Sequence, residues 1–293
     1  MENKIRLSFS KIFNIAKTEY TKWICNPRMI ILFCMMIYIY DYIILEMKQA
    51  SIDMGMKCNI FEPFMAIGNS ELLLLFLPII FITQLGDFPK TDGNTMFYIC
   101  RTGKKNWIFG QMLFIIWAEL TYLLSIFVFS VLFALPFSHT TDKWSDVVTK
   151  YVYIFPERSG SLMAHLLTNR LYNNLSPMKT LLYTGSLMFL NLLMIAMVML
   201  AGFTFGKRVL SIVINCGILC IGTALSFTGS KIKWFFPTAN TTCWVHFDKY
   251  LNKQILDIRF SYLYFGIIIM FLTLISINTI QDYDFSKVTD MED

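Results

Sequence analysis

The chain has 293 residues, 56% of them hydrophobic, with 27 Phe and a formal net charge of +5. A water-soluble domain of this length has too small a core to cover so much apolar surface. Long uncharged runs instead predict membrane-spanning helices, because a helix needs about 20 apolar residues to cross a hydrocarbon core of ~30 Å. The composition therefore indicates an all-α polytopic membrane protein, and the small positive charge gives no reason to expect a nucleic-acid partner.

Residues 1–26 are expected to form an amphipathic helix. Apolar side chains recur at helical spacing on one face, and Lys4, Lys11 and Lys22 fall on the other. A basic face opposite an aromatic face is typical of a helix lying in the membrane surface. The apolar residues expected to enter the lipid include Phe9, Phe13, Tyr20 and Trp23. The alternative is a soluble amphipathic helix that docks on a partner. Polar residues recur up to the first long apolar run, so we expect no cleaved signal peptide.

Six membrane-spanning helices are expected in a transmembrane domain covering 27–293. They lie at about 29–47, 70–87, 107–135, 181–206, 209–229 and 260–281. Asn26 and Pro27 give the first of them a sharp start, as a cap and a first-turn proline. The second is the shortest, because its uncharged core reaches only ~22 Å, so it must include Glu71 and Asp87 or thin the bilayer.

Lys and Arg set the expected orientation. They are concentrated before the first span, in 90–105 and in the turn formed by Lys207 and Arg208. Those on the other side lie mostly in two long loops, 136–180 and 230–259, which count less in the positive-inside rule. Both termini are therefore expected to be cytoplasmic.

The two outer loops are expected to contain structure of their own. In 136–180, a helix is predicted behind Thr141 and Asp142, with an apolar face that runs from Trp144 to Phe155. A second short helix is predicted around 162–167. In 230–259, the stretch WFFPTANTTCWVHF is expected to dip into the outer leaflet and return, which requires protein to cover its backbone.

Two of the seven cysteines, Cys58 and Cys243, are predicted on the outer side, where a disulfide is permitted. Two free thiols are the favoured interpretation. The bridge remains the alternative.

No catalytic, metal or cofactor site is predicted in this chain. H-E-x-x-H, G-x-S-x-G and a paired intramembrane Asp are all absent from the sequence. GFTFGKR, at 202–208, differs from a Walker A loop because three residues separate its glycines and Arg replaces Ser or Thr. An intramembrane enzyme is therefore poorly supported.

A few polar residues fall inside the expected spans. Glu119 is the only charge within 107–135, and Asn191 and Asn215 lie in the fourth and fifth spans. Because a charge at membrane depth costs ~2.5–3.5 kcal/mol, Glu119 is expected to line a transport path or a subunit interface. The alternative is a locally bonded acid that fixes helix packing. Asn191 and Asn215 are candidates for the same path or interface, and interhelical hydrogen bonding is their simpler role.

The polar segment 91–105 lies between two apolar runs and has the features of a short surface helix. Thr91 or Asp92 can cap it, Gly103 can stop it, and Lys104 and Lys105 would hold it at the cytoplasmic surface. Such a helix could transmit a push from a cytoplasmic partner to the adjacent spans. A plain loop resting on the bilayer is the alternative.

Two stretches resemble the type-2 ABC transporter permease family. AKTEYTKWICNPRMIILF is similar to the start of such permeases, with Glu19, Asn26, Pro27 and Arg28 at the matching places. DGNTMFYICRTGKKNWIFGQ is similar to the segment after the second span. Its matching residues are Asp92, Thr95, Arg101 and Gly110, whereas Gln111 stands where the family often has Lys.

The resemblance implies a subunit of an ATP-driven exporter in the cell membrane, with an interfacial N-terminal helix, a coupling helix and outer re-entrant or interfacial helices. It implies a second identical or related permease and a separate ATPase subunit that carries ATP and Mg. The residues expected to couple to that ATPase are Asp92, Thr95, Met96, Phe97, Tyr98 and Arg101. Charge-poor, aromatic spans favour an amphipathic or hydrophobic cargo. The alternative function is a polytopic sensor or assembly factor that works through its outer loops.

Overall fold

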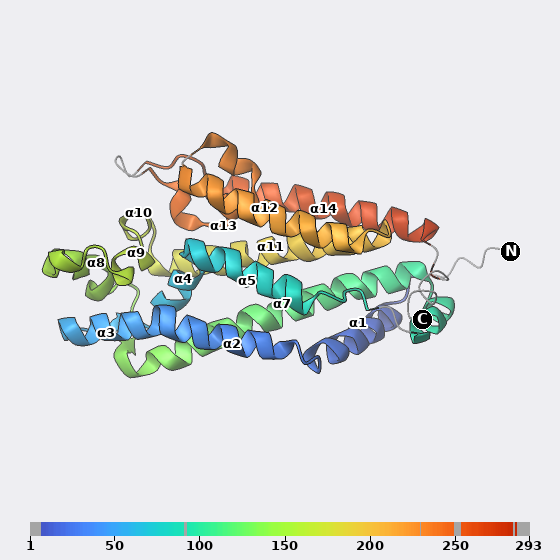
Figure 1. Ribbon diagram of the computed structural model, residues 1–293, viewed down its shortest axis with the longest axis horizontal. Coiled ribbons are helices and arrows are strands. Elements are labelled where there is room, and N and C mark those ends of the chain that lie inside the picture. Colours follow the sequence, from blue (N-terminus) through green and yellow to red (C-terminus); the bar gives the residue numbers. More distant parts are fainter. Residues whose placement is uncertain (1–6, 91–92, 229, 249–252, 284, 286–293) are drawn as a thin grey trace.

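The computed structural model describes the chain except for residues 1–6, 91–92, 229, 249–252, 284 and 286–293. Long helices run side by side in an elongated bundle (Figure 1). In chain order the α-helices are α1 Phe9–Ile24, α2 Met29–Ile39, α3 Leu45–Met54, α4 Glu62–Asn69, α5 Glu71–Gln84, α6 Gly93–Thr102, α7 Lys104–Ala134, α8 Asp146–Ile154, α9 Leu162–Leu166, α10 Asn169–Tyr172, α11 Pro177–Thr204, α12 Arg208–Thr228, α13 Pro237–Thr241 and α14 Ile258–Asp282.

Shorter elements complete the fold. A π-helical turn, η1 Tyr40–Ile44, joins α2 to α3, and the 3-10 segments are η2 Leu135–Phe137, η3 Pro156–Arg158, η4 Lys231–Phe235 and η5 Cys243–His246. The strands β1 Cys58–Asn59 and β2 Ser138–His139 pair in parallel, with Cys58 opposite Ser138.

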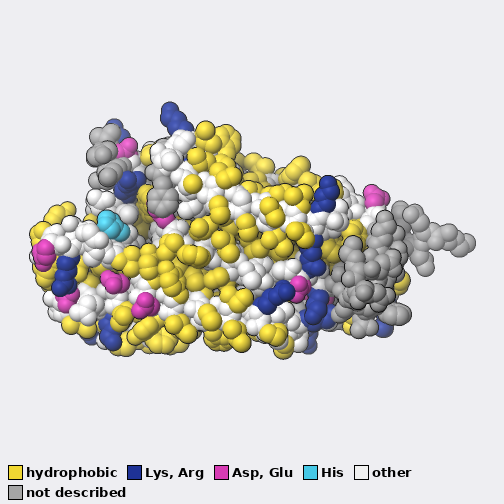
Figure 2. Space-filling view, viewed as in Figure 1, with side chains coloured by type: hydrophobic (Ala, Val, Ile, Leu, Met, Phe, Trp, Pro, Cys, Tyr) yellow, Lys and Arg dark blue, Asp and Glu magenta, His cyan; other side chains and the backbone are white. Residues whose placement is uncertain are grey.

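Among the described residues, five helical stretches are long and apolar enough to cross a membrane: Met29–Met54, Lys104–Phe137, Pro177–Thr204, Arg208–Ser226 and Ile258–Asp282. The pair α4 and α5 passes the same test only when taken together, with a bend of 81° between them. Hydrophobic side chains cover the middle of the molecule, and charged ones gather toward its two ends (Figure 2). These helices indicate a predominantly helical, multi-pass protein embedded in a membrane.

The first predicted span, 29–47, lies within a longer helical stretch. The helix does not end at residue 47 but continues through α3 to Met54, where Gly55 adopts φ +63° and stops it. Hydropathy falls at Lys48, and polar residues beyond that point leave lipid but do not break a helix. The helix ends where Gly55 takes a left-handed backbone conformation, which glycine adopts readily.

The second predicted span, 70–87, contains the shorter helix α5, and the preceding helix α4 was not predicted. The break between them lies at Ser70, which is extended. Asn69 fixes the bend from three sides. Its Nδ2 donates to Thr184 Oγ1 on α11 at 3.0 Å, its Oδ1 accepts from the Cys243 amide at 3.1 Å, and its carbonyl accepts from Trp244 Nε1 at 3.0 Å.

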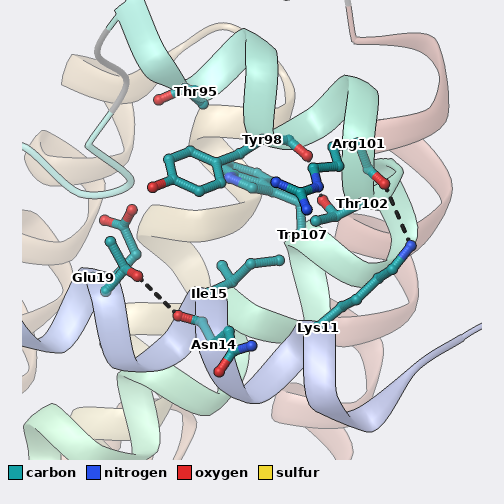
Figure 3. A pocket seen from close by; sticks show the side chains of 10 residues that line it. Lys11, Asn14, Ile15, Glu19, Thr95, Tyr98, Arg101, Thr102 and Trp107 are labelled. Carbon is teal, nitrogen blue, oxygen red and sulfur yellow. Dashed lines mark hydrogen bonds between the residues drawn. The ribbon is translucent and has the colours of Figure 1, made fainter.

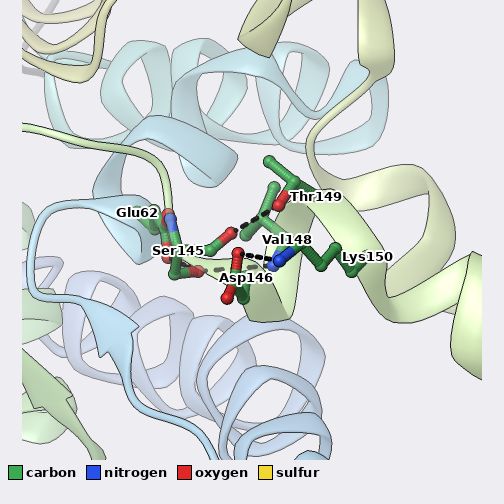
Figure 4. A network of polar contacts seen from close by, with 6 residues as sticks. All are labelled: Glu62, Ser145, Asp146, Val148, Thr149 and Lys150. Atoms are coloured by element: carbon green, nitrogen blue, oxygen red, sulfur yellow. Dashed lines mark hydrogen bonds and ion pairs between the residues drawn. The ribbon is translucent and has the colours of Figure 1, made fainter.

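We call residues 136–176 the outer cap after their predicted side of the membrane, and the buried carboxylate of Glu62 ties them to α4 (Figure 4). Glu62 is fully buried and accepts three hydrogen bonds, from Asn59 N at 2.9 Å, Ser145 N at 2.7 Å and Ser145 Oγ at 2.7 Å. Helix α8 therefore starts behind Ser145, whose Oγ also accepts from Val148 N at 3.3 Å. The helix predicted behind Thr141 and Asp142 is thus present but begins later, at Asp146.

In the second predicted outer loop, 230–259, helix α13 is covered by protein, whereas Ile232, Phe235 and Ile255 are exposed. All five residues of α13 are buried, and α13 packs on α11, α12 and α14. The predicted disulfide alternative is excluded, because Cys58 and Cys243 are both free and buried. Cys58 Sγ lies 3.8 Å from the Met47 carbonyl, and Cys243 Sγ lies 3.7 Å from Thr184 Oγ1.

A buried histidine joins this segment to α14. His246 Nδ1 lies 3.0 Å from the Thr242 carbonyl, and its Nε2 lies 2.8 Å from Ser261 Oγ, which donates to Asn240 Oδ1 at 2.9 Å. Burial lowers the pKa of His246 to about 4, against a weaker opposing effect of the Thr242 carbonyl. Both His246 and Ser261 are 0% exposed, so this pair packs two elements together and is not an accessible nucleophile.

Candidate functional site

Helix α1 packs along the first half of α7. Tyr20 Oη lies 2.8 Å from Thr121 Oγ1, and the rings of Phe13 and Trp117 meet edge to face at 5.1 Å. The helices approach closely at Gly110, where an added Cβ would lie 2.6 Å from Ile15 Cγ2. Gly110, which stands at the place of a glycine in the permease family, is therefore the point where α7 contacts α1.

The apolar stripe of α1 is partly buried against α7 and partly exposed. Trp23 is buried and packs edge to face with Phe114 of α7 at 6.3 Å. Phe9 and Phe13 remain 76% and 41% exposed. The exposed side is available to lipid, and insertion of this side into the membrane surface stays a prediction.

Helix α6 occupies the middle of the segment 91–105. Gly103, with φ +86°, separates it from α7. Tyr98 is 45% exposed and Arg101 is exposed, whereas Thr95 and Ile99 are buried. Three residues expected to couple to an ATPase cannot be placed: Asp92 and the side chains of Met96 and Phe97 lie outside the described residues.

Between α1 and α6 lies a cleft of about 310 Å³, which we call the α1–α6 cleft (Figure 3). It is lined by Lys11, Asn14, Ile15, Thr18, Glu19, Thr95, Tyr98, Arg101, Thr102 and Trp107. Two cationic side chains, Lys11 and Arg101, lie toward one side, and Glu19 lies on the other (Figure 3). The cleft thus presents both signs of charge next to an aromatic ring.

Hydrogen bonds hold the two sides of the cleft together. Lys11 Nζ donates to the Arg101 carbonyl at 3.3 Å. Ser8 N donates to Asn106 Oδ1 at 2.9 Å, and Asn106 Nδ2 donates to the Thr102 carbonyl at 2.7 Å. The Arg101 guanidinium makes no hydrogen bond or ion pair with any described residue, so it is free to meet a ligand or partner.

Sequence reasoning found the α6 side of this cleft and missed the α1 side. Lys11, Asn14 and Thr18 recur at a spacing of three and four, which places them on one helical face. No contact with α6 was predicted for that polar face, which lines the cleft between the two helices. The repeated polar spacing was the available signal.

The polar residues predicted inside the spans are buried within this chain. Glu119 is 0% exposed, and neither carboxyl oxygen has a hydrogen-bond partner among the described residues. Asn215 Nδ2 donates to the Ile195 carbonyl of α11 at 3.1 Å, and the Oδ1 atoms of Asn191 and Asn215 lack described partners. Both amide atoms of Gln84 and Gln111 are likewise unpartnered. A transport role for Glu119 stays a prediction.

The side chains of the α1–α6 cleft can bind a polar ligand. No group of three His, Cys, Asp or Glu among the described residues could hold a metal ion. Hydroxyl groups, an amide and both charge signs suit a peptide or protein surface. No family model, curated protein or solved structure matches this chain.

Proposed function

We propose that this protein is the membrane-spanning permease subunit of an ATP-driven ABC exporter for an amphipathic or hydrophobic cargo. In this proposal α4 and α5 together form one of six spans, α1 is the interfacial helix and α6 is the coupling helix. A separate ATPase subunit carries ATP and Mg and docks at the α1–α6 cleft. The setting is a bacterial cell membrane, with both termini in the cytoplasm.

The observation that carries the proposal is the connection from the α1–α6 cleft to a membrane span. Helix α6 leads through the single residue Gly103 into α7, and α1 packs along α7 from Ile15 to Tyr20. A displacement of either helix by a partner therefore acts directly on α7. A short helix with an exposed tyrosine and a free guanidinium is suited to receive that partner.

Both described ends of the chain support the orientation. Ser8 bonds Asn106, and Lys104 Nζ donates to the carbonyl of Gln281 at 2.8 Å and of Tyr283 at 2.7 Å. The beginning of α1 and the end of α14 therefore lie on the same side, at the start of α7. The basic residues of this side make it the cytoplasmic one by the positive-inside rule.

A second copy of the permease is supported by an exposed acid on the first span. Asp41 lies in the π-helical turn η1, about 18 Å along the helix from Met29. Beside it the rings of Tyr38 and Tyr42 stack at 5.4 Å. A carboxylate that faces lipid at this depth is costly, so we expect a neighbouring subunit to cover it.

The test is capture of an ATPase. The chain is coexpressed with a candidate ATPase that contains a Walker A motif, and the complex is purified through a tag on the permease. Tyr98→Ala and Phe97→Ala should each reduce capture by roughly 30-fold, as expected for loss of an interface anchor worth about 2 kcal/mol. Tyr153→Ala, at an exposed tyrosine of the outer cap, is the matched control. Equal capture in all variants would reject coupling through α6.

The outer cap favours a second candidate function, a sensor or assembly factor. Three consecutive apolar residues of α8 are exposed: Val152 at 37%, Tyr153 at 81% and Ile154 at 49%. Such a patch beyond the spans suits a protein partner. If the wild-type chain captures no ATPase and Tyr153→Ala abolishes the protein's role in the cell, the sensor or assembly factor replaces the permease as the proposed function.

A further inference from the structure

We infer that the α1–α6 cleft is the docking site of the chain's own acidic C-terminal segment, residues 286–293. This segment reads SKVTDMED and carries Asp290, Glu292 and Asp293 against the single Lys287. The inference rests on where the described chain leads into this segment and on the charges of the cleft.

The segment begins beside the cleft. Phe285 is buried and packs edge to face against Trp107, a residue that lines the cleft, with ring centroids 5.4 Å apart. Lys104 holds the chain just before it through the Tyr283 carbonyl, and its Nζ lies 5.9 Å from the centre of the Phe285 ring. Eight extended residues reach up to about 26 Å, whereas α6 is about 15 Å long. The segment can therefore cover the whole cleft.

The charges of the cleft match the segment. Arg101 has no described partner, and Lys11 Nζ uses one hydrogen bond on the Arg101 carbonyl. A carboxylate between these two side chains would form charge-assisted hydrogen bonds, bidentate at the guanidinium. Glu19 lies across the cleft from Arg101 (Figure 3), where Lys22 Nζ is 3.6 Å from its Oε1, so its side of the cleft offers no unpaired cation to an acid. The acidic residues are therefore directed to the end of the cleft that holds Lys11 and Arg101.

Tethering makes weak contacts sufficient. A short linker presents the segment to the cleft at an effective concentration in the millimolar range. With the proposed function, on which this consequence rests, the bound segment covers Tyr98 and Arg101 and competes with the ATPase for them. When the transporter assembles, the ATPase then replaces the C-terminal segment in the cleft.

The test uses the full chain alone, purified into lipid nanodiscs without any ATPase. A photocrosslinking amino acid, p-benzoylphenylalanine, replaces Met291, and crosslinked peptides are mapped by mass spectrometry. We expect crosslinks to residues of α1 and α6 that line the cleft. Reversing the cleft charges with Lys11→Glu and Arg101→Glu should lower their yield several-fold, as expected when two charge pairs become repulsive.

Two further variants decide the interpretation. Lys17→Glu with Lys105→Glu makes the same change in net charge at exposed residues outside the cleft, and it should leave the yield unchanged. Reversing Asp290, Glu292 and Asp293 to Lys should restore crosslinking in the charge-reversed cleft. Crosslinks to lipid, to a second copy or to the outer cap, or a yield insensitive to charge reversal, would overturn the inference. Because no ATPase is present, failure of the proposed function does not change these results.

Discussion

The two ends of the bundle are held in different ways. At the outer end, the Glu62 carboxylate is fully buried with three donors, and Asn69 bonds α11 and the second outer segment. At the other end, α1 and α6 enclose a cleft of about 310 Å³ that is bridged by the exposed bond from Lys11 to the Arg101 carbonyl. Buried polar contacts are costly to lose, whereas exposed ones exchange with water at little cost.

The difference shows which end can change shape. Removing any partner from the outer network leaves buried groups unpaired, so this end should behave as one rigid unit. The α1–α6 cleft can widen or accept a partner while exposed groups pass to solvent. The four substitutions below test this contrast, in order of decreasing expected effect.

Glu62→Ala should give the largest loss of stability. It leaves the amides of Asn59 and Ser145 and the Ser145 hydroxyl without their acceptor, which should cost about 3–5 kcal/mol. Thermal unfolding of the purified protein measures the loss. Glu157→Ala, at an exposed acid of the same cap, should leave the midpoint unchanged. A small effect at Glu62 would mean that the outer end is not rigidly held.

Acid should weaken the outer end through His246. Its pKa of about 4 in the folded protein lies below the ordinary value of about 6.5, so the fold favours the neutral ring. The resulting stabilisation is complete above pH 6.5 and is lost as the pH falls to 4, with an upper limit of about 3 kcal/mol.

The measurement is the unfolding midpoint between pH 7 and pH 4.5 for the wild type and for His246→Gln. The wild type should lose more stability than the variant over this interval. His165→Gln, at an exposed histidine of α9, is the control and should follow the wild type. Parallel curves for the wild type and His246→Gln would contradict the prediction.

Gly110→Ala should displace α1 from α7. The new Cβ would lie 2.6 Å from Ile15 Cγ2, and overpacking of this kind costs about 1–3 kcal/mol. Solvent exposure of α1, followed by hydrogen exchange, should increase while the outer cap keeps its protection. Gly217→Ala in α12, where nothing lies within 4 Å of the added atom, is the control. Unchanged exchange in α1 would place its attachment elsewhere.

Asp53→Asn should have the smallest effect. The carboxylate pairs with Arg158 between α3 and η3, and both side chains contact solvent. Water replaces such a partner readily. The unfolding midpoint should stay close to that of the wild type, and a large drop would show that surface pairs also hold the outer cap.

Hydropathy was sufficient to locate the long helices, because crossing a membrane requires an uncharged run whatever surrounds it. The predicted start near residue 260 lies close to the actual start of α14 at Ile258. The helix continues to Met54, past the predicted end of the span near residue 47, because a helix can leave the membrane and continue. Apolar runs report the length of lipid contact, and turn residues such as Gly55 report the helix end.

The residues that contact a helix were harder to predict than the polar and apolar faces of that helix. Helical spacing identified two faces of α1, yet nothing in that spacing says that Ile15 meets Gly110 or that Lys11 faces α6. The role of Glu62 was missed for the same reason, since its three donors come from residues 59 and 145. Contacts between distant segments depend on the tertiary arrangement, which a single sequence does not state.

The π-helical turn η1 sets the rotational phase of everything beyond it in the first span. A π turn holds one residue more than an α turn, which advances the following helix by about 100°. Deleting Asp41 would therefore restore a regular α-helix and rotate α3 about its own axis. Met47 and Ala50, now buried, would turn away from the core, and Ile52, now 61% exposed, would turn with them. A single extra residue thus decides which side of α3 meets the outer cap.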